Sequence, residues 1–153
     1  MKLYTPMINK ALKIAYDAHH GQADKNGTPY IYHPAYLAAQ MDTEEEIITA
    51  LLHDVVEDTH LTFADLEREG FTQAILEALR HLTHNDGSDY MEHVYRIKQN
   101  PLAVKVKLAD LRHNSNPTRN ANLLPGYSAR FREKYAEAIE ILEKQAEAAK
   151  QDD

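Results

Sequence analysis

The chain has 153 residues, contains no cysteine and carries a formal net charge of −7. This length favours a single domain with a real hydrophobic core. The absence of cysteine excludes disulfides, thiolate metal sites and cysteine nucleophiles. The negative charge argues against binding nucleic acid over a broad surface, and no apolar run reaches the length of a signal peptide or a membrane span. We therefore expect a cytoplasmic protein with no membrane partner.

Helical periodicity runs through almost the whole sequence. Apolar residues recur at three- and four-residue steps from Ile8 to Ala18, and Thr43 and Glu46 have the spacing of a capping box. Such signals predict helices over about residues 6–18, 33–41, 44–58, 63–69, 72–82, 89–99, 102–114 and 128–149. The prediction is an all-α, single-domain bundle of about seven or eight helices, with its core at about 5–145 and a frayed tail at 146–153. The alternating pattern of Val104–Leu108 also fits a short strand, which five residues cannot decide.

The pair His53-Asp54 stands inside the apolar segment Ala50–Val56. On a helix, Glu57 lies three residues after Asp54 and four after His53, and Asp58 lies four after Asp54, so the four side chains share a face. Carboxylates crowded at a helix C-terminus repel one another and oppose the macrodipole, and a bound cation would reverse both penalties. A lone His-Asp pair also arises by chance, and acidic residues at a helix end are usually solvated.

Two distant residues offer further ligands. His33 stands 20 residues before His53, and Asp110 follows the apolar stretch that ends at Ala109. Neutral imidazole and carboxylate together suit a borderline-hard divalent cation, and zinc could occupy the same set. If His33, His53, Asp54 and Asp110 converge, we expect a metal site that hydrolyses a phosphate ester or anhydride.

Three blocks of the sequence carry a resemblance to a known family. They are AYDAHHGQADKNGTPYIYHP (Ala15–Pro34), ALLHDVVEDT (Ala50–Thr59) and VKLADLRHN (Val106–Asn114). In this order they resemble the HD-domain phosphohydrolases, and within that superfamily the hydrolase domain of RelA/SpoT-type proteins and the small stand-alone alarmone hydrolases. The similarity spans about residues 8–142.

The resemblance implies an all-α HD fold that holds one divalent metal, usually manganese, on His33, His53, Asp54 and Asp110. It implies that Glu57 and Asp58 position or activate the attacking water, and that Asn114 contacts the ribose or its neighbourhood. The implied reaction removes the 3′-pyrophosphate from guanosine tetra- or pentaphosphate. Lys25 and Lys107 are further candidates for contacts with the nucleotide, although a solvated lysine face is the alternative for Lys107.

The identity of the substrate stays open between several readings. Asp24 stands where the alarmone hydrolases commonly have a basic residue, and Ser115-Asn116-Pro117 departs from the continuation usual after Asn114. One alternative is a phosphatase for another nucleotide or a phosphorylated cofactor, with the same metal site. Another is a non-catalytic, nucleotide-sensing HD domain. Apolar residues on the terminal helix make a homodimer a further expectation.

Overall fold

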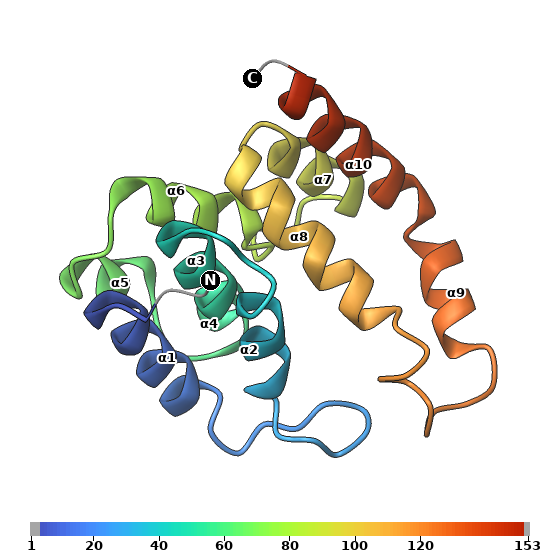
Figure 1. Cartoon of the computed structure of the whole chain (residues 1–153), viewed down its shortest axis with the longest axis horizontal. Coiled ribbons are helices and arrows are strands. Elements are labelled where there is room, and N and C mark those ends of the chain that lie inside the picture. The colour runs from blue at the N-terminus through green and yellow to red at the C-terminus, as the bar shows by residue number, and fades with distance from the viewer. Residues whose placement is uncertain (1–3, 152–153) are drawn as a thin grey trace.

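Helices form the framework of the protein in the computed structural model, which describes residues 4–151 (Figure 1). They are α1 (Pro6–Ala18), α2 (Tyr32–Ala38), α3 (Glu44–Leu52), α4 (Val55–Asp58), α5 (Phe63–Arg68), α6 (Gln73–Leu82), α7 (Tyr90–Lys98), α8 (Pro101–Asn114), α9 (Tyr127–Lys134) and α10 (Ala136–Gln151). Between residues 4 and 151 the only β-type pairing is an isolated bridge from Ala23 to Pro29. The all-α prediction is confirmed.

Local side-chain caps set where several helices begin. The Thr43 hydroxyl accepts the Glu46 N–H at 3.2 Å, and the Glu46 carboxylate accepts the Thr43 N–H at 3.4 Å, which completes the expected capping box. The side chains of Thr5 and Asn100 cap α1 and α8 by accepting a backbone N–H three residues further on. Each of the two residues stands directly before a proline at the first helical position. These contacts span three residues, so the local sequence can specify them.

Two of the expected helices are broken. α3 ends at Leu52 and α4 begins at Val55, so His53 and Asp54 lie in a two-residue break and not in a continuous helix over 44–58. The expected helix over 128–149 is interrupted at Tyr135, where the backbone leaves helical geometry (φ −106, ψ 13). The described chain therefore carries more helical segments than the seven or eight expected.

Two smaller expectations also change. The segment Val104–Leu108 is helical, inside α8. Its apolar residues look strand-like in sequence because α8 is buried on several sides, with Val104, Val106 and Leu108 all in the core. The helix α10 continues to Gln151, past the expected helix end at about residue 149. The division into a core at about 5–145 and a frayed tail at 146–153 stays a prediction, and residues 152–153 lie outside the described range.

The helix α3 is the centre of the core. All six residues from Ile47 to Leu52 are buried, and α3 packs against α1, α2, α6 and α8 (Figure 1). Truncating a fully buried leucine such as Leu52 to alanine typically costs about 2–5 kcal/mol of unfolding free energy. This packing fixes the end of α3, and with it His53, between α2 and α8.

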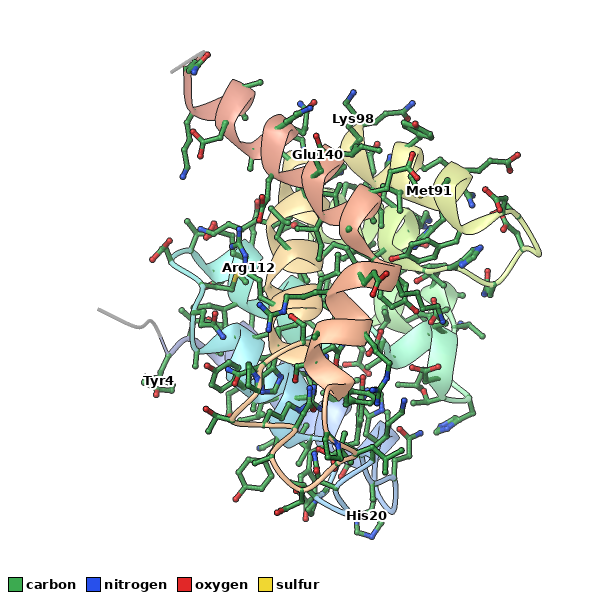
Figure 2. The ribbon with its side chains drawn as sticks, turned by 90° about the vertical axis from the view of Figure 1, so that its right-hand side faces the viewer. Tyr4, His20, Met91, Lys98, Arg112 and Glu140 are labelled. Carbon is green, nitrogen blue, oxygen red and sulfur yellow. The ribbon has the colours of Figure 1, made fainter. Side chains whose placement is uncertain are left out.

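The C-terminal helices lie along the other side of α8. In Figure 2, α9 and α10 face the viewer. The helix α10 packs on both α7 and α8. Leu142 of α10 is fully buried in this contact region. None of the helices in the described part of the chain is long and apolar enough to cross a membrane.

Candidate metal centre

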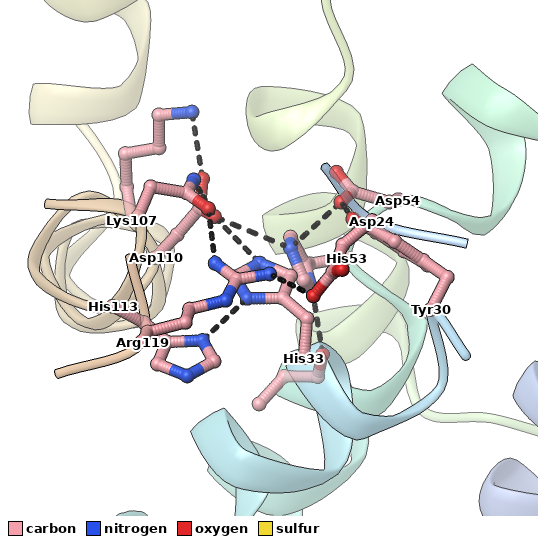
Figure 3. A network of polar contacts seen from close by, with 11 residues as sticks. Asp24, Tyr30, His33, His53, Asp54, Lys107, Asp110, His113 and Arg119 are labelled. Atoms are coloured by element: carbon pink, nitrogen blue, oxygen red, sulfur yellow. Dashed lines mark hydrogen bonds and ion pairs between the residues drawn. The ribbon is translucent and has the colours of Figure 1, made fainter. Parts of the chain in front are cut away.

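The four predicted metal ligands are brought together by three separate parts of the fold. His33 comes from the first turn of α2, His53 and Asp54 from the break after α3, and Asp110 from the last turns of α8 (Figure 3). Ligand atoms of His33, His53 and Asp54 lie within 4.8 Å of one another. Asp110 Oδ1 lies 2.8 Å from His33 Nε2 and 3.8 Å from His53 Nε2.

His53 presents one ring nitrogen to this cluster. Its Nδ1–H donates to the carbonyl of Ala50 at 2.7 Å, which leaves Nε2 directed at Asp54 Oδ2, 3.0 Å away, and at Asp110. His53 is 4% exposed, yet its Nε2 has no hydrogen-bond partner. A buried nitrogen that faces two carboxylates without forming a hydrogen bond fits a cation ligand, because a metal ion satisfies all three groups at once.

The charge of Asp110 is balanced by its neighbours on α8. Lys107 Nζ donates to Asp110 Oδ2 at 3.0 Å, and Asn114 Nδ2 donates to Asp110 Oδ1 at 3.0 Å. Burial alone would raise the pKa of Asp110, but Lys107, His33 and His53 hold it well below its ordinary value. Asp110 is therefore a charged carboxylate held on several sides.

The pKa of His53 is set by the nearby carboxylates and by burial. Burial alone would lower its pKa, but Asp54 and Asp110 outweigh burial and raise the pKa well above the ordinary value. Metal ligation requires a neutral imidazole, so a cation that binds here displaces a proton.

Tyr30 is a further member of the site, outside the predicted ligand set. Its hydroxyl donates a hydrogen bond to Asp54 Oδ2. Burial, together with Asp54, raises the pKa of Tyr30 far above its ordinary value, so the phenol keeps its proton and remains a donor. Tyr30 therefore orients Asp54 from outside the ligand set.

Glu57 and Asp58 lie on α4, at the exposed edge of the cluster. One carboxylate oxygen from each lies within 4.8 Å of Asp54. Glu57 Oε1 accepts the backbone N–H of His84 at 2.7 Å, which ties α4 to the loop before α7. Partial burial and the nearby Asp54 raise the pKa of both side chains, so each is a better proton acceptor than a free carboxylate.

The three candidates for substrate contacts have different surroundings. Lys25 donates to the Tyr127 hydroxyl at 2.7 Å and lies 4.8 Å from the centre of that ring. Both residues line a cavity of about 310 Å³ that also includes Tyr30 and Asn114. Lys107 does not line this cavity, because its ammonium group turns to Asp110. A separate cavity of about 460 Å³ lies between α8 and α10, away from the ligand cluster.

Asp24 and Arg119 form a contact across this cavity that we had not expected. Asp24 Oδ1 accepts the N–H groups of Asn26 and Thr28, at 2.8 and 3.0 Å, and so organises its own loop. Arg119 donates to Asn114 Oδ1 at 2.6 Å and lies 3.5 Å from Asp24 Oδ2. Only 15% of the Arg119 side chain is exposed.

His93 on α7 gives a prediction for stability at low pH. Burial and the nearby Lys107 lower its pKa to about 4. Above pH ~6.5, the ordinary pKa of histidine, His93 is neutral in both states; below it the unfolded chain takes up a proton that the folded chain does not. We expect the free energy of unfolding to fall by up to about 3 kcal/mol between pH ~6.5 and pH ~4 through this group alone.

Urea unfolding of the wild type and of His93→Leu at several pH values measures that contribution. The difference in the free energy of unfolding between the two proteins should change with pH from about 6.5 to about 4 and be constant at higher pH. A constant difference throughout would show that His93 titrates normally.

Comparisons with known proteins identify the family to which the chain is similar. A family model described as HD domain matches residues 11–113. The bifunctional (p)ppGpp synthase/hydrolase SpoT of Escherichia coli is 32% identical over 121 residues, which cover 70% of this chain and 17% of that protein. A guanosine-3′,5′-bis(diphosphate) 3′-pyrophosphohydrolase of Haemophilus influenzae is 34% identical over 116 residues, which cover 66% of this chain and 17% of that protein. The chain thus spans less than a fifth of the length of these curated relatives.

A solved structure has the same fold. It is described as a metazoan ortholog of SpoT that hydrolyzes ppGpp and plays a role in starvation responses, and it superimposes with a TM-score of 0.71 at 24% identity. The match covers 95% of this chain and 88% of that one. Since the HD-domain model also matches more than half of the sequence, the chain belongs to the HD-domain family.

Proposed function

We propose that this protein is a metal-dependent phosphohydrolase that acts on a nucleotide, with guanosine 3′,5′-bis(diphosphate) as the leading substrate and its 3′-pyrophosphate as the leaving group. The observation that carries the proposal is the buried Nε2 of His53, which makes no hydrogen bond but faces Asp54 and Asp110 beside His33. The curated relatives, described as 3′-pyrophosphohydrolases of this compound, support the choice of substrate.

His33, His53, Asp54 and Asp110 would hold the metal. Two nitrogen and two oxygen ligands suit manganese, and zinc accepts the same set. A divalent ion bound here lowers the pKa of a water molecule and polarises a phosphoryl oxygen. Tyr30 and Lys107 keep Asp54 and Asp110 in place through their hydrogen bonds.

In this proposal either Glu57 or Asp58 takes the proton of the attacking water, and the other carboxylate helps to position that water. Both carboxylates lie beside Asp54 at the exposed edge of the cluster, where water has access. The backbone N–H of His84 occupies one oxygen of Glu57 and leaves the other available. Their raised pKa values bring them nearer to the range in which a carboxylate accepts a proton efficiently.

The cavity of about 310 Å³ would hold the nucleoside part of the substrate. It is next to the metal ligands through Tyr30, and Lys25, Asn114, Arg119 and Tyr127 supply charge, hydrogen bonds and an aromatic face. Asn114 is already bonded to Asp110 and Arg119, so it links the metal site to this pocket. Lys107 was a candidate for contact with the substrate, but in this proposal it is the hydrogen-bond partner of Asp110.

One observation favours a second candidate function. The ion pair of Asp24 with Arg119 reduces the positive charge of the cavity, which would suit a substrate with fewer phosphates, such as a nucleotide monophosphate or a phosphorylated cofactor. A sensing domain without catalysis would still bind the nucleotide.

A homodimer and a cytoplasmic location remain predictions. Light scattering would test the first, and cell fractionation would test the second.

A panel of substrates tests the proposal. Wild type and Asp54→Ala are incubated with Mn²⁺ and alarmones, nucleoside mono- to triphosphates or phosphorylated dinucleotides. Release of pyrophosphate from an alarmone by the wild type alone supports the leading proposal, and release of orthophosphate alone supports the phosphatase. If Mn²⁺ does not bind and no substrate is cleaved, the enzyme proposal is wrong.

Removing the charge of Lys25 should weaken substrate binding. In Lys25→Ala we expect KM to rise about 5–30-fold with a smaller change in kcat, because Lys25 lies in the cavity and not at the ligand cluster. Lys98→Ala, which removes an exposed lysine of α7 (Figure 2), is the matched control. Equal KM values for the two variants would remove Lys25 from the binding site.

A further inference from the structure

His113 forms a direct hydrogen bond to a candidate metal ligand. Its Nδ1 lies 2.7 Å from Nδ1 of His33, and the two rings are nearly parallel, with centroids 5.0 Å apart and planes 5° apart (Figure 3). His113 stands on α8, three residues after Asp110, so α8 contacts His33 from two sides. His33 is thereby held through both of its ring nitrogens.

Only one of the two Nδ1 atoms can carry the shared hydrogen. His33 Nε2 faces Asp110 Oδ1 at 2.8 Å, on the side of the ring where the other ligand atoms converge. Without a cation this contact needs a hydrogen on His33 Nε2, because the charged Asp110 can only accept, and for a neutral His33 the shared hydrogen then comes from His113. A cation that takes the place of the Nε2 hydrogen needs the lone pair of Nε2, so in the metal-bound form the hydrogen of a neutral His33 must be on Nδ1. It then donates to His113 Nδ1, and His113 carries its own hydrogen on Nε2.

The opposite arrangement belongs to the metal-free state and is incompatible with a bound cation. If His113 donated to His33, the hydrogen of His33 would be on Nε2 and would point at Asp110, where the cation belongs. An acceptor at His113 Nδ1 therefore favours the tautomer of His33 that can bind metal. Ligating histidines in metalloproteins generally have such a partner on the other nitrogen, and its loss typically costs about 10–100-fold in metal affinity.

The ring of His113 is itself held in position. Tyr36 stacks on it with centroids 4.1 Å apart and planes 14° apart. Tyr36 lies three residues after His33 on α2, and therefore on the same side of that helix. The stack and the hydrogen bond join α2 to α8 at the ligand cluster.

We propose that His113 is a positioning residue of the metal centre, which stabilises the metal-bound tautomer of His33 by accepting its Nδ1 hydrogen. The proposal rests on the metal binding proposed above. It concerns a residue outside the ligand set, and it predicts that the acceptor atom of His113 matters more than its aromatic ring.

Two substitutions separate the acceptor from the ring. In His113→Asn the amide oxygen can occupy the place of Nδ1 and still accept a hydrogen bond, whereas His113→Leu has a similar branch with no acceptor. Both variants lose the stack on Tyr36. We expect the affinity for Mn²⁺, measured by titration calorimetry, to fall about 10–100-fold in His113→Leu and by less than about 3-fold in His113→Asn. Thermal unfolding of the metal-free proteins shows whether either variant fails to fold.

The tautomer provides a second readout. In the wild type loaded with Zn²⁺, which is diamagnetic, ¹⁵N NMR should show His33 protonated at Nδ1 and hydrogen-bonded, and His113 protonated at Nε2. Equal Mn²⁺ affinities for wild type and His113→Leu would overturn the proposal, as would equal losses in both variants, because the ring would then be what matters. Failure of the wild type to bind Mn²⁺ would overturn the proposed function as well, so the two failures are distinguishable.

Discussion

Replacing Asp110 by alanine is expected to lower the affinity for Mn²⁺ at least about 100-fold and to abolish measurable hydrolysis. Asp110 is in contact with both candidate histidine ligands and accepts hydrogen bonds from Lys107 and Asn114. Its loss removes one oxygen ligand and the group that orients His33. Calorimetric titration with Mn²⁺ and a hydrolysis assay on the same preparations measure the two effects.

The same substitution should also destabilise the metal-free protein. Only 18% of the Lys107 side chain is exposed, and in Asp110→Ala its ammonium group loses its carboxylate partner. Removing one partner of a buried ion pair typically costs about 3–5 kcal/mol of unfolding free energy. Lys107→Met is the matched second change, because it removes the charge that would be left unpaired.

The double variant Asp110→Ala/Lys107→Met separates stability from function. We expect it to recover much of the lost unfolding free energy while metal binding stays absent. An Asp110→Ala protein that binds Mn²⁺ with wild-type affinity would remove Asp110 from the ligand set. If the double variant is no more stable than Asp110→Ala, the cost has another origin than the unpaired lysine.

Glu57→Gln is expected to reduce kcat by about 10²–10⁴-fold while metal affinity stays within a few-fold of the wild type. The glutamine keeps an oxygen that can accept the N–H of His84, so the loop before α7 should retain its attachment. What is lost is the ability to accept a proton. Steady-state kinetics with Mn²⁺, together with calorimetric titration, distinguish loss of proton transfer from loss of metal.

Asp58→Asn tests the second carboxylate, and Glu92→Gln removes an exposed acid of α7 as the control. If Glu57 is the base, Asp58→Asn should be the milder of the two, with a change mainly in the position of the water. A Glu57→Gln protein with wild-type kcat, beside a strongly impaired Asp58→Asn, would transfer the proton acceptor to Asp58. Full activity in both would show that neither takes the proton.

The structure changes how Asp24 is understood. In the sequence it is an acidic residue in a loop where alarmone hydrolases commonly carry a basic one. In the fold it caps its own loop and lies opposite Arg119, a residue 95 positions away. An acidic residue at position 24 therefore affects both the shape and the charge of the cavity. For this reason the substrate panel includes nucleotides that carry less charge.

The starts of the helices and the composition of the core were determined by the sequence itself. Thr43 and Glu46 form a capping box, and the apolar residues of 47–52 are all buried, because these features depend on neighbours three or four residues away. The convergence of His33, His53, Asp54 and Asp110 was predicted from a resemblance and from an unusual local cluster of acids. Sequence patterns that relate near neighbours do not give the distances between these four residues.

Only the tertiary structure decided which other residues complete the site. The hydrogen bond of His33 to His113 spans 80 positions, and that of Tyr30 to Asp54 spans 24. The break at His53-Asp54 has the same origin, since a continuous helix was compatible with the local sequence. Helical periodicity tells which face of an element is buried, but not which element covers it. Those partners were decided by the packing of α3 between α2 and α8.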